Sequence, residues 1–146
     1  MRASIRLSAF MGLCLTVLAG QSSDSFRRGY VLFHGEEALA GKIRGHDEGL
    51  PPEAVRCSNC HEATSGKLTR QAAPHVDRSL LLEYRQRRGG PPSRYDAASF
   101  CKVLRTGVDP VFIVIAREMP VYDLNEAQCN SLWTFFTEKD PRNDKD

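Results

Sequence analysis

The stretch Cys57-Ser58-Asn59-Cys60-His61 carries the clearest chemistry in the sequence. Two thiols three positions apart on a helical turn can each add to one of the two vinyl groups of a haem. The histidine that follows directly can then face the iron and supply an imidazole ligand. This spacing therefore predicts covalent attachment of a c-type haem at Cys57 and Cys60, with His61 as a ligand of the iron.

A Cys-x-x-Cys pair has two other common uses, in a structural zinc site and in a redox-active dithiol. A structural zinc site needs a second close pair of cysteines or histidines, and Cys101 and Cys129 are isolated in the sequence. A thioredoxin-like redox pair is typical of a strand–helix–strand context, which the flanking sequence does not offer. His61 completes the haem motif and favours it over both alternatives.

The first 20 residues have the pattern of a secretory signal peptide. Two positive charges precede a mostly apolar run over Leu7–Leu18, which is short for a membrane span. We expect cleavage near Ala19 or Gly20, with loss of Cys14. A retained, uncleaved anchor is the alternative.

The remaining chain is electrically balanced. The sequence has 20 basic and 18 acidic side chains, and removal of Arg2 and Arg6 with the signal leaves 18 of each. No overall field favours nucleic acid or an anionic membrane as a partner. One local basic cluster surrounds a Gly-Pro-rich turn, and its members are Arg85, Arg87, Arg88 and Arg94. This cluster is either a solvated turn without a binding role, or a surface that neutralises haem propionates or docks an acidic partner.

Cys101 and Cys129 are the cysteines outside the motif once the signal is removed. In an exported protein such a pair invites a disulfide. The bridge would close a loop of about 29 residues and contribute on the order of 3 kcal/mol to stability. The sequence does not show whether the two Cα atoms lie close enough, so we treat the disulfide as a prediction.

Periodicity and capping residues predict a domain of short helices over residues 21–138, followed by a charged, flexible tail over 139–146. Val108–Ala116 is apolar and β-branched, but it has no strand to pair with, so we expect an extended or one-turn segment. Gly41–Pro52 is rich in glycine and proline and is predicted to be a loop. The first expected helix has about 13 residues from Phe26 and is capped by Asp24 or Ser25, and a short helical turn follows at Pro52–His61. The next runs over Arg78–Arg88 and is capped by Asp77. The last two run from Ser93 or Asp96 to Leu104 and over Glu126–Glu138, the latter capped by Asp123 or Asn125.

Gly29 lies four residues before Phe33, on one face of the first predicted helix. A glycine on a helix face permits the close approach of a second helix. The simpler alternative is a weak point in the helix.

A haem of this type needs a sixth ligand unless the position is kept open for chemistry. Met119 is the best candidate, because it is the methionine left after signal removal and Pro120 stiffens its loop. His46 is the best alternative, since its glycine-rich loop could fold over the distal face. His34 is interpreted as a surface histidine and His75 as a helix-entry residue.

A ligating imidazole usually donates its second N–H to a carbonyl oxygen, which fixes the ring. Pro74 lies 13 residues after His61 and is a good candidate for that carbonyl. The predicted haem-binding residues are thus Cys57, Cys60, His61, Pro74 and Met119, of which His61 and Met119 bind the metal.

These features follow one another as they do in the monohaem class I c-type cytochromes of the bacterial periplasm, which the chain resembles. The resemblance runs over roughly residues 25–138. It rests on the following residues: Gly29 and Phe33 in the first helix, the haem motif at 57–61, Pro74, Met119-Pro120, and Leu132, Trp133, Phe135 and Phe136 in the last helix. One departure is the separation of 24 positions between Phe33 and Cys57, where compact members have only a few residues.

The resemblance implies an all-α cytochrome c fold, with four to five short helices around one covalent haem c. It also implies a periplasmic electron-transfer protein rather than an enzyme, either a soluble carrier or the cytochrome subunit of a dehydrogenase. Redox proteins such as a dehydrogenase or an oxidase would be its partners, with membranes reached only through them. The alternative from a different class is a haem-based ligand sensor or small haem enzyme with an open sixth position.

Overall fold

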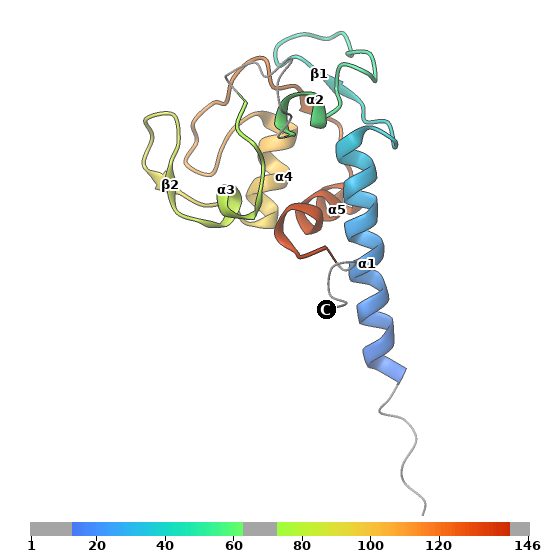
Figure 1. Cartoon of the computed structure of the whole chain (residues 1–146). Helices are drawn as coiled ribbons and strands as arrows, with labels where there is room; N and C mark the ends of the chain where they lie inside the picture. The colour runs from blue at the N-terminus through green and yellow to red at the C-terminus, as the bar shows by residue number, and fades with distance from the viewer. Residues whose placement is uncertain (1–12, 63–72, 141–146) are drawn as a thin grey trace, which may run out of the picture.

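The computed structural model describes residues 13–62 and 73–140, with side chains from residue 22 onward. This part of the chain is mostly helical, with five helices and two small antiparallel sheets (Figure 1). The helices are α1 (Leu13–His34), α2 (Ser58–His61), α3 (Arg78–Leu82), α4 (Ala97–Thr106) and α5 (Glu126–Thr137). The strands are β1 (Gly41–Lys42), β2 (Arg85–Gln86), β3 (Pro92–Ser93) and β4 (Val121–Tyr122).

The fold is therefore not purely α-helical, which corrects that part of the sequence analysis. β1 pairs with β4, and β2 pairs with β3, and both pairs are antiparallel. Each strand is only two residues long, so the alternation of apolar and polar residues that marks a strand has no length over which to appear.

α1 begins at Leu13, well before the predicted cap at Asp24 or Ser25. The apolar residues of the leader continue the helix, so no cap is needed at the polar segment that follows. The helix ends at His34 rather than near residue 38, because Gly35 takes a left-handed conformation with φ of 74°. The Glu36 N–H then donates to the Val31 carbonyl at 3.0 Å, which closes the helix as a Schellman motif.

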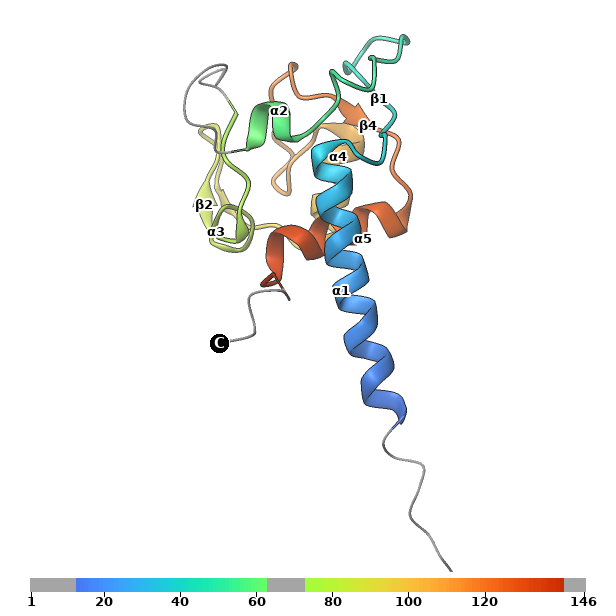
Figure 2. The same ribbon diagram turned by 45° about the vertical axis from the view of Figure 1, so that its right-hand side comes forward.

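The first half of α1 projects beyond the body of the molecule, and its second half crosses α5 (Figures 1 and 2). Residues 13–20, assigned above to the signal peptide, form the first turns of this helix, and residues 1–12 lie outside the described part. None of the helices in the described ranges has the length and hydropathy that a membrane crossing requires.

Gly29 is the point at which α1 and α5 come closest. A Cβ atom at this position would lie 2.1 Å from the Ser131 carbonyl oxygen and 2.5 Å from the Phe135 Cβ. Around this point the Phe135 ring contacts Phe26 and Phe33, with ring centroids 5.4 and 5.6 Å apart. The interpretation of Gly29 as a site of close helix approach is confirmed.

α4 and α5 have the capping residues that the sequence predicts. Asp96 caps α4 and Asn125 caps α5, each accepting from the backbone N–H of the third helical residue. α4 ends at Gly107, whose φ of 69° is the left-handed conformation that glycine adopts without strain. The cysteines Cys101 and Cys129 are buried between these helices and lie in a disulfide, with their Cα atoms 5.5 Å apart.

α3 is shorter than predicted. Asp77 caps it as expected, but the helix ends at Leu82 rather than Arg88. The chain then turns into the β2–β3 hairpin, where Arg88 and Gly89 have φ of 48° and 73° and the Gly90 N–H donates to the Arg87 carbonyl. These values are typical of a type I′ turn, in which Gly89 takes one of the two left-handed positions without strain, and a continuing helix would exclude them.

Val108–Ala116 is an irregular loop rather than a regular strand. A single antiparallel bridge joins Val108 to Val114 across a turn. The buried Asp109 carboxylate accepts from the N–H groups of Val111 and Ile113 and so shapes the loop. Phe112, which has φ of 64°, is largely exposed at its tip.

Gly29→Ala tests the helix crossing. Alanine is the better helix former, but its Cβ has no room against the α5 backbone, so we expect the free energy of unfolding to fall by about 1–3 kcal/mol. Gly49→Ala is the control, because the nearest atom to its added Cβ lies 3.9 Å away. Denaturant unfolding of both variants measures the effect, and equal stabilities would contradict the close crossing.

The disulfide is tested by mass spectrometry of the protein prepared without reductant. We expect Cys101 and Cys129 to resist alkylation and their peptides to be linked. Cys101→Ser combined with Cys129→Ser should lower the free energy of unfolding by about 3 kcal/mol, the loop-closure value for a bridge of this length. Two alkylatable thiols in the unsubstituted protein would refute the bridge.

Candidate functional site

The haem-motif residues lie on one tight turn. Cys57 is the N-cap of α2, and its carbonyl oxygen accepts from the N–H groups of Cys60 and His61 at 3.2 and 3.0 Å. Residues three apart on such a turn share a face, so both thiols can reach one bound group. Cys57 and Cys60 are not bonded to each other, and Cys60 is exposed.

The His61 imidazole is held from one side by Pro74. The ring Nδ1 lies 2.7 Å from the Pro74 carbonyl oxygen, which can only accept. Nδ1 must therefore carry the proton and donate. Burial lowers the pKa of His61, and the nearby His75 acts in the same direction, while the bond to Pro74 opposes them. The ring is thus neutral, and its Nε2 keeps a free lone pair.

That lone pair faces Met119. The His61 Nε2 and the Met119 Sδ are 3.3 Å apart, although the two residues are 58 positions apart in the chain. A neutral imidazole with its proton on Nδ1 has no hydrogen to place between them, so two electron-pair donors face each other. Both atoms are of kinds that can bind haem iron.

The donor set fits the iron of a haem. Imidazole nitrogen and thioether sulfur are the His/Met ligand pair of c-type cytochromes. At 3.3 Å the two donor atoms are too close to hold an iron between them, so the Met119 side chain would have to move for an iron to bind. Met119 lies on an irregular segment after Ala116, where such a movement breaks no helix or sheet.

Tyr122 contacts the chain at the start of the haem-motif turn, and no sequence pattern identifies this residue. Its buried hydroxyl donates to the Val55 carbonyl at 3.0 Å, and the Cys57 Sγ lies 3.9 Å from the Tyr122 hydroxyl oxygen. Burial raises the pKa of the Cys57 thiol to about 11, and burial also raises the pKa of Tyr122. A thiol with so high a pKa remains protonated near neutral pH, which is unlike the reactive thiolate of a disulfide oxidoreductase.

His46 is not at the site. It lies in the exposed loop between β1 and Cys57, where its Nε2 is 2.6 Å from the Arg117 Nη2. Because a guanidinium can only donate, the Nε2 lone pair of His46 is already engaged. The structure brings Met119 to the haem-motif histidine and does not bring His46.

The other two histidines have local roles. His34 is partly buried at the end of α1, and its Nε2 lies 3.2 Å from a Glu62 carboxylate oxygen. His75 is exposed just before α3, and its Nδ1 lies 3.0 Å from the His61 carbonyl oxygen. Neither imidazole faces the Nε2 of His61.

The basic cluster is used largely within its own hairpin. Arg87 donates to the backbone carbonyls of Leu80 and Ser93, and its guanidinium lies over the Tyr95 ring. Arg85 forms an exposed ion pair with its neighbour Glu83, and Arg94 lies over the exposed ring of Tyr84. Exposed pairs of this kind contribute little to stability.

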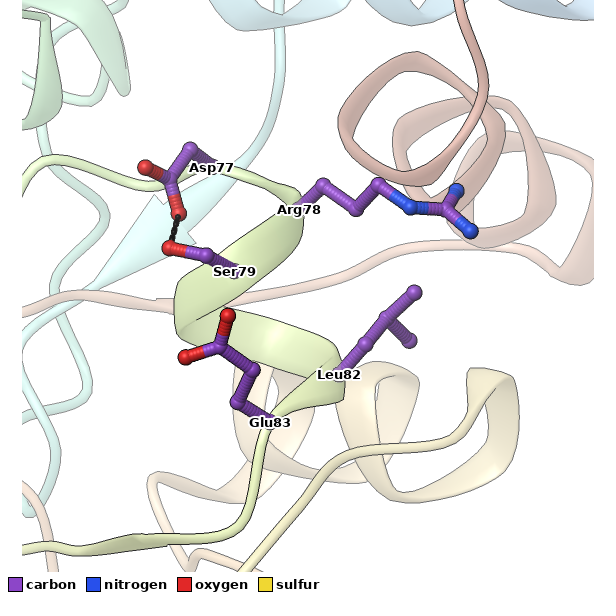
Figure 3. A pocket seen from close by; sticks show the side chains of 5 residues that line it. All are labelled: Asp77, Arg78, Ser79, Leu82 and Glu83. Carbon is purple, nitrogen blue, oxygen red and sulfur yellow. Dashed lines mark hydrogen bonds between the residues drawn. The ribbon is translucent and has the colours of Figure 1, made fainter.

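A shallow hollow beside α3 is lined by none of the haem-motif residues (Figure 3). Asp77, Ser79 and Glu83 extend from one side of the helix and Arg78 and Leu82 from the other. The Asp77 carboxylate is already used as the helix cap, so the hollow offers no convergent reactive group. Its lining residues are Asp77, Arg78, Ser79, Leu82 and Glu83.

Comparison with known proteins adds no family assignment: no family model, no curated protein and no solved structure matches this chain. Within residues 13–62 and 73–140, no three His, Cys, Asp or Glu side chains gather as a metal-binding group. At the haem-motif turn the structure brings together the His61 Nε2 and the Met119 Sδ, which are 3.3 Å apart.

Tyr122→Phe tests the support beneath the motif. Loss of the hydroxyl leaves the Val55 carbonyl without its donor in a buried setting, so we expect the free energy of unfolding to fall by about 1–3 kcal/mol. Tyr84→Phe is the matched control, because that ring is 70% exposed. Denaturant unfolding of the purified protein compares the two, and a Tyr122→Phe variant as stable as the control would contradict the assignment.

Proposed function

We propose that this protein is a monohaem c-type cytochrome of the class I type, which carries single electrons between redox partners. The proposal includes the cytochrome c fold, of which the described helices form the larger part. It also includes export, with a signal peptide removed near residue 19 or 20, and a periplasmic location.

One observation carries the proposal. The motif of Cys57, Cys60 and His61 predicts covalent haem attachment from sequence alone, and the imidazole of that motif faces the sulfur of Met119 at 3.3 Å. The motif spacing and the observed geometry therefore both favour His61 as a ligand, and the geometry adds Met119. A sensor or a haem enzyme needs an open sixth position, and the nearness of the Met119 sulfur to His61 favours an electron carrier over both.

Each residue of the site has a distinct task. Cys57 and Cys60 would hold the haem by thioether bonds, and His61 and Met119 would bind its iron. The Pro74 carbonyl fixes the imidazole tautomer and keeps Nε2 available. When bound, the haem supplies a one-electron redox couple, and methionine ligation favours its ferrous form.

The protein contributes ligands and surroundings rather than acid–base chemistry. Met119 packs against the hydrophobic core and His61 is partly buried, and low polarity around them raises the cost of a change in charge. Dehydrogenases or oxidases with accessible redox groups are the proposed partners, and the chain would act as a soluble carrier or as a dehydrogenase subunit. The Cys101–Cys129 disulfide agrees with an oxidising compartment.

Met119→Ala tests the proposed ligation. The ferric protein should show the weak red absorption that marks a methionine–iron bond, and the variant should lose it, because alanine has no sulfur. The ferrous variant should also bind carbon monoxide readily through the vacated position. Optical spectra of the oxidised and reduced proteins measure both changes.

His46→Ala is the matched control, since it removes the alternative ligand while leaving Met119 in place. It should keep the methionine absorption. A high-spin unsubstituted protein that binds carbon monoxide avidly would contradict the carrier function and favour the sensor or enzyme. Retention of the absorption in Met119→Ala with its loss in His46→Ala would reassign the ligand.

A further inference from the structure

The long stretch between α1 and Cys57 lies beside the segment that carries Met119. β1 pairs with β4 in the register Gly41 with Tyr122 and Lys42 with Val121, and the Asp123 N–H donates to the Ala40 carbonyl. β4 begins two residues after Met119. The chain on the C-terminal side of the methionine is therefore fixed to this stretch.

Arg44 reaches the N-terminal side of the same segment. Its guanidinium donates to the carbonyl oxygens of Gly107 and Ile115, each at 3.1 Å. The Ile115 N–H also donates to the Gly107 carbonyl at 2.9 Å. One side chain thus joins both ends of the loop over residues 107–115, and this loop ends four residues before Met119.

Gly107 makes this arrangement possible. A Cβ atom at that position would lie 2.1 Å from the Arg44 Nη1. Arginine suits the position better than lysine, because its rigid planar fork presents several donors at once to separate acceptors. A second contact, between His46 and Arg117, joins the same stretch to the residues just before Met119.

The carbonyls that Arg44 binds belong to an irregular loop, whose other support is a bridge and the Asp109 carboxylate. A charged donor forms stronger hydrogen bonds than a neutral one, and removal of Arg44 takes this donor from the Ile115 carbonyl and leaves the Gly107 carbonyl with the Ile115 N–H alone. The position of the Met119 segment therefore depends on a side chain that contacts neither Met119 nor His61.

We propose that Arg44 is a positioning residue, which holds Met119 opposite His61 and so regulates the access of other ligands to the sixth position. The inference rests on the proposed function, because it requires an iron bound between these two residues. It assigns a role to the long stretch between Phe33 and Cys57, which keeps the methionine segment in place.

The test measures imidazole binding to the ferric, haem-loaded full chain. Imidazole competes with the Met119 sulfur, so its apparent affinity reports how firmly the methionine is held, and loss of the red absorption follows the exchange. We expect Arg44→Ala to bind imidazole at least about tenfold more tightly, which corresponds to about 1.4 kcal/mol. Arg44→Lys should bind it with intermediate affinity.

Arg105→Ala is the matched control. Arg105 also donates to a backbone carbonyl, that of Leu124 at 2.9 Å, and it pairs with Glu126 rather than contacting the methionine segment. Its removal should lower stability and leave the imidazole affinity unchanged. A purely structural role of Arg44 would give the same pattern as this control.

The possible outcomes separate the positioning role of Arg44 from the proposed function. Imidazole affinity in Arg44→Ala equal to that in Arg105→Ala overturns the positioning role while leaving the proposed function intact. If Arg44→Ala does not fold, an unchanged affinity in Arg44→Lys overturns it instead. Absence of the methionine absorption in the unsubstituted protein contradicts the proposed function, and this inference with it.

Discussion

The structure of the site depends on a single hydrogen bond, from the His61 Nδ1 to the Pro74 carbonyl oxygen at 2.7 Å. It determines which ring nitrogen carries the proton and therefore which one keeps a lone pair. It also joins the haem-motif turn to the chain that enters α3, from a residue 13 positions away. With the ring fixed in this way, the position of Met119 decides whether two donors face each other, and the rest of the structure holds that segment in place.

Two kinds of support serve this purpose. The crossing of α1 and α5 at Gly29 and the disulfide between α4 and α5 build a frame from segments that are distant in sequence. The buried apolar residues of these helices form the core against which Met119 packs. The second support is local: β1 pairs with β4 beyond the methionine, and Arg44 closes the loop before it. The frame stabilises the fold, whereas the local contacts position the Met119 sulfur.

Much of the site could be predicted from the sequence, because covalent and coordination chemistry restrict residue types and spacing. The need for a soft ligand and the proline after it indicate Met119, and the need of a ligating imidazole for an acceptor indicates Pro74. Tyr122 and Arg44 could not be found in this way, since their partners are backbone carbonyls that any residue provides, more than 60 positions away. Likewise, the caps of α4 and α5 are local signals, but the end of α3 was set by the turn at Gly89, and the two-residue strands were too short to leave a pattern.

The central claim is that the turn at residues 57–61 carries a covalent haem, and one measurement tests it directly. The protein, expressed in a host that exports it and attaches haem, is denatured, extracted with acidified organic solvent and digested, and the peptide spanning Cys57–His61 is analysed by mass spectrometry. We expect this peptide to retain one haem, joined to both cysteines, after extraction has removed any haem held by coordination alone. Recovery of the same peptide without haem, with both thiols free to alkylate, would contradict it.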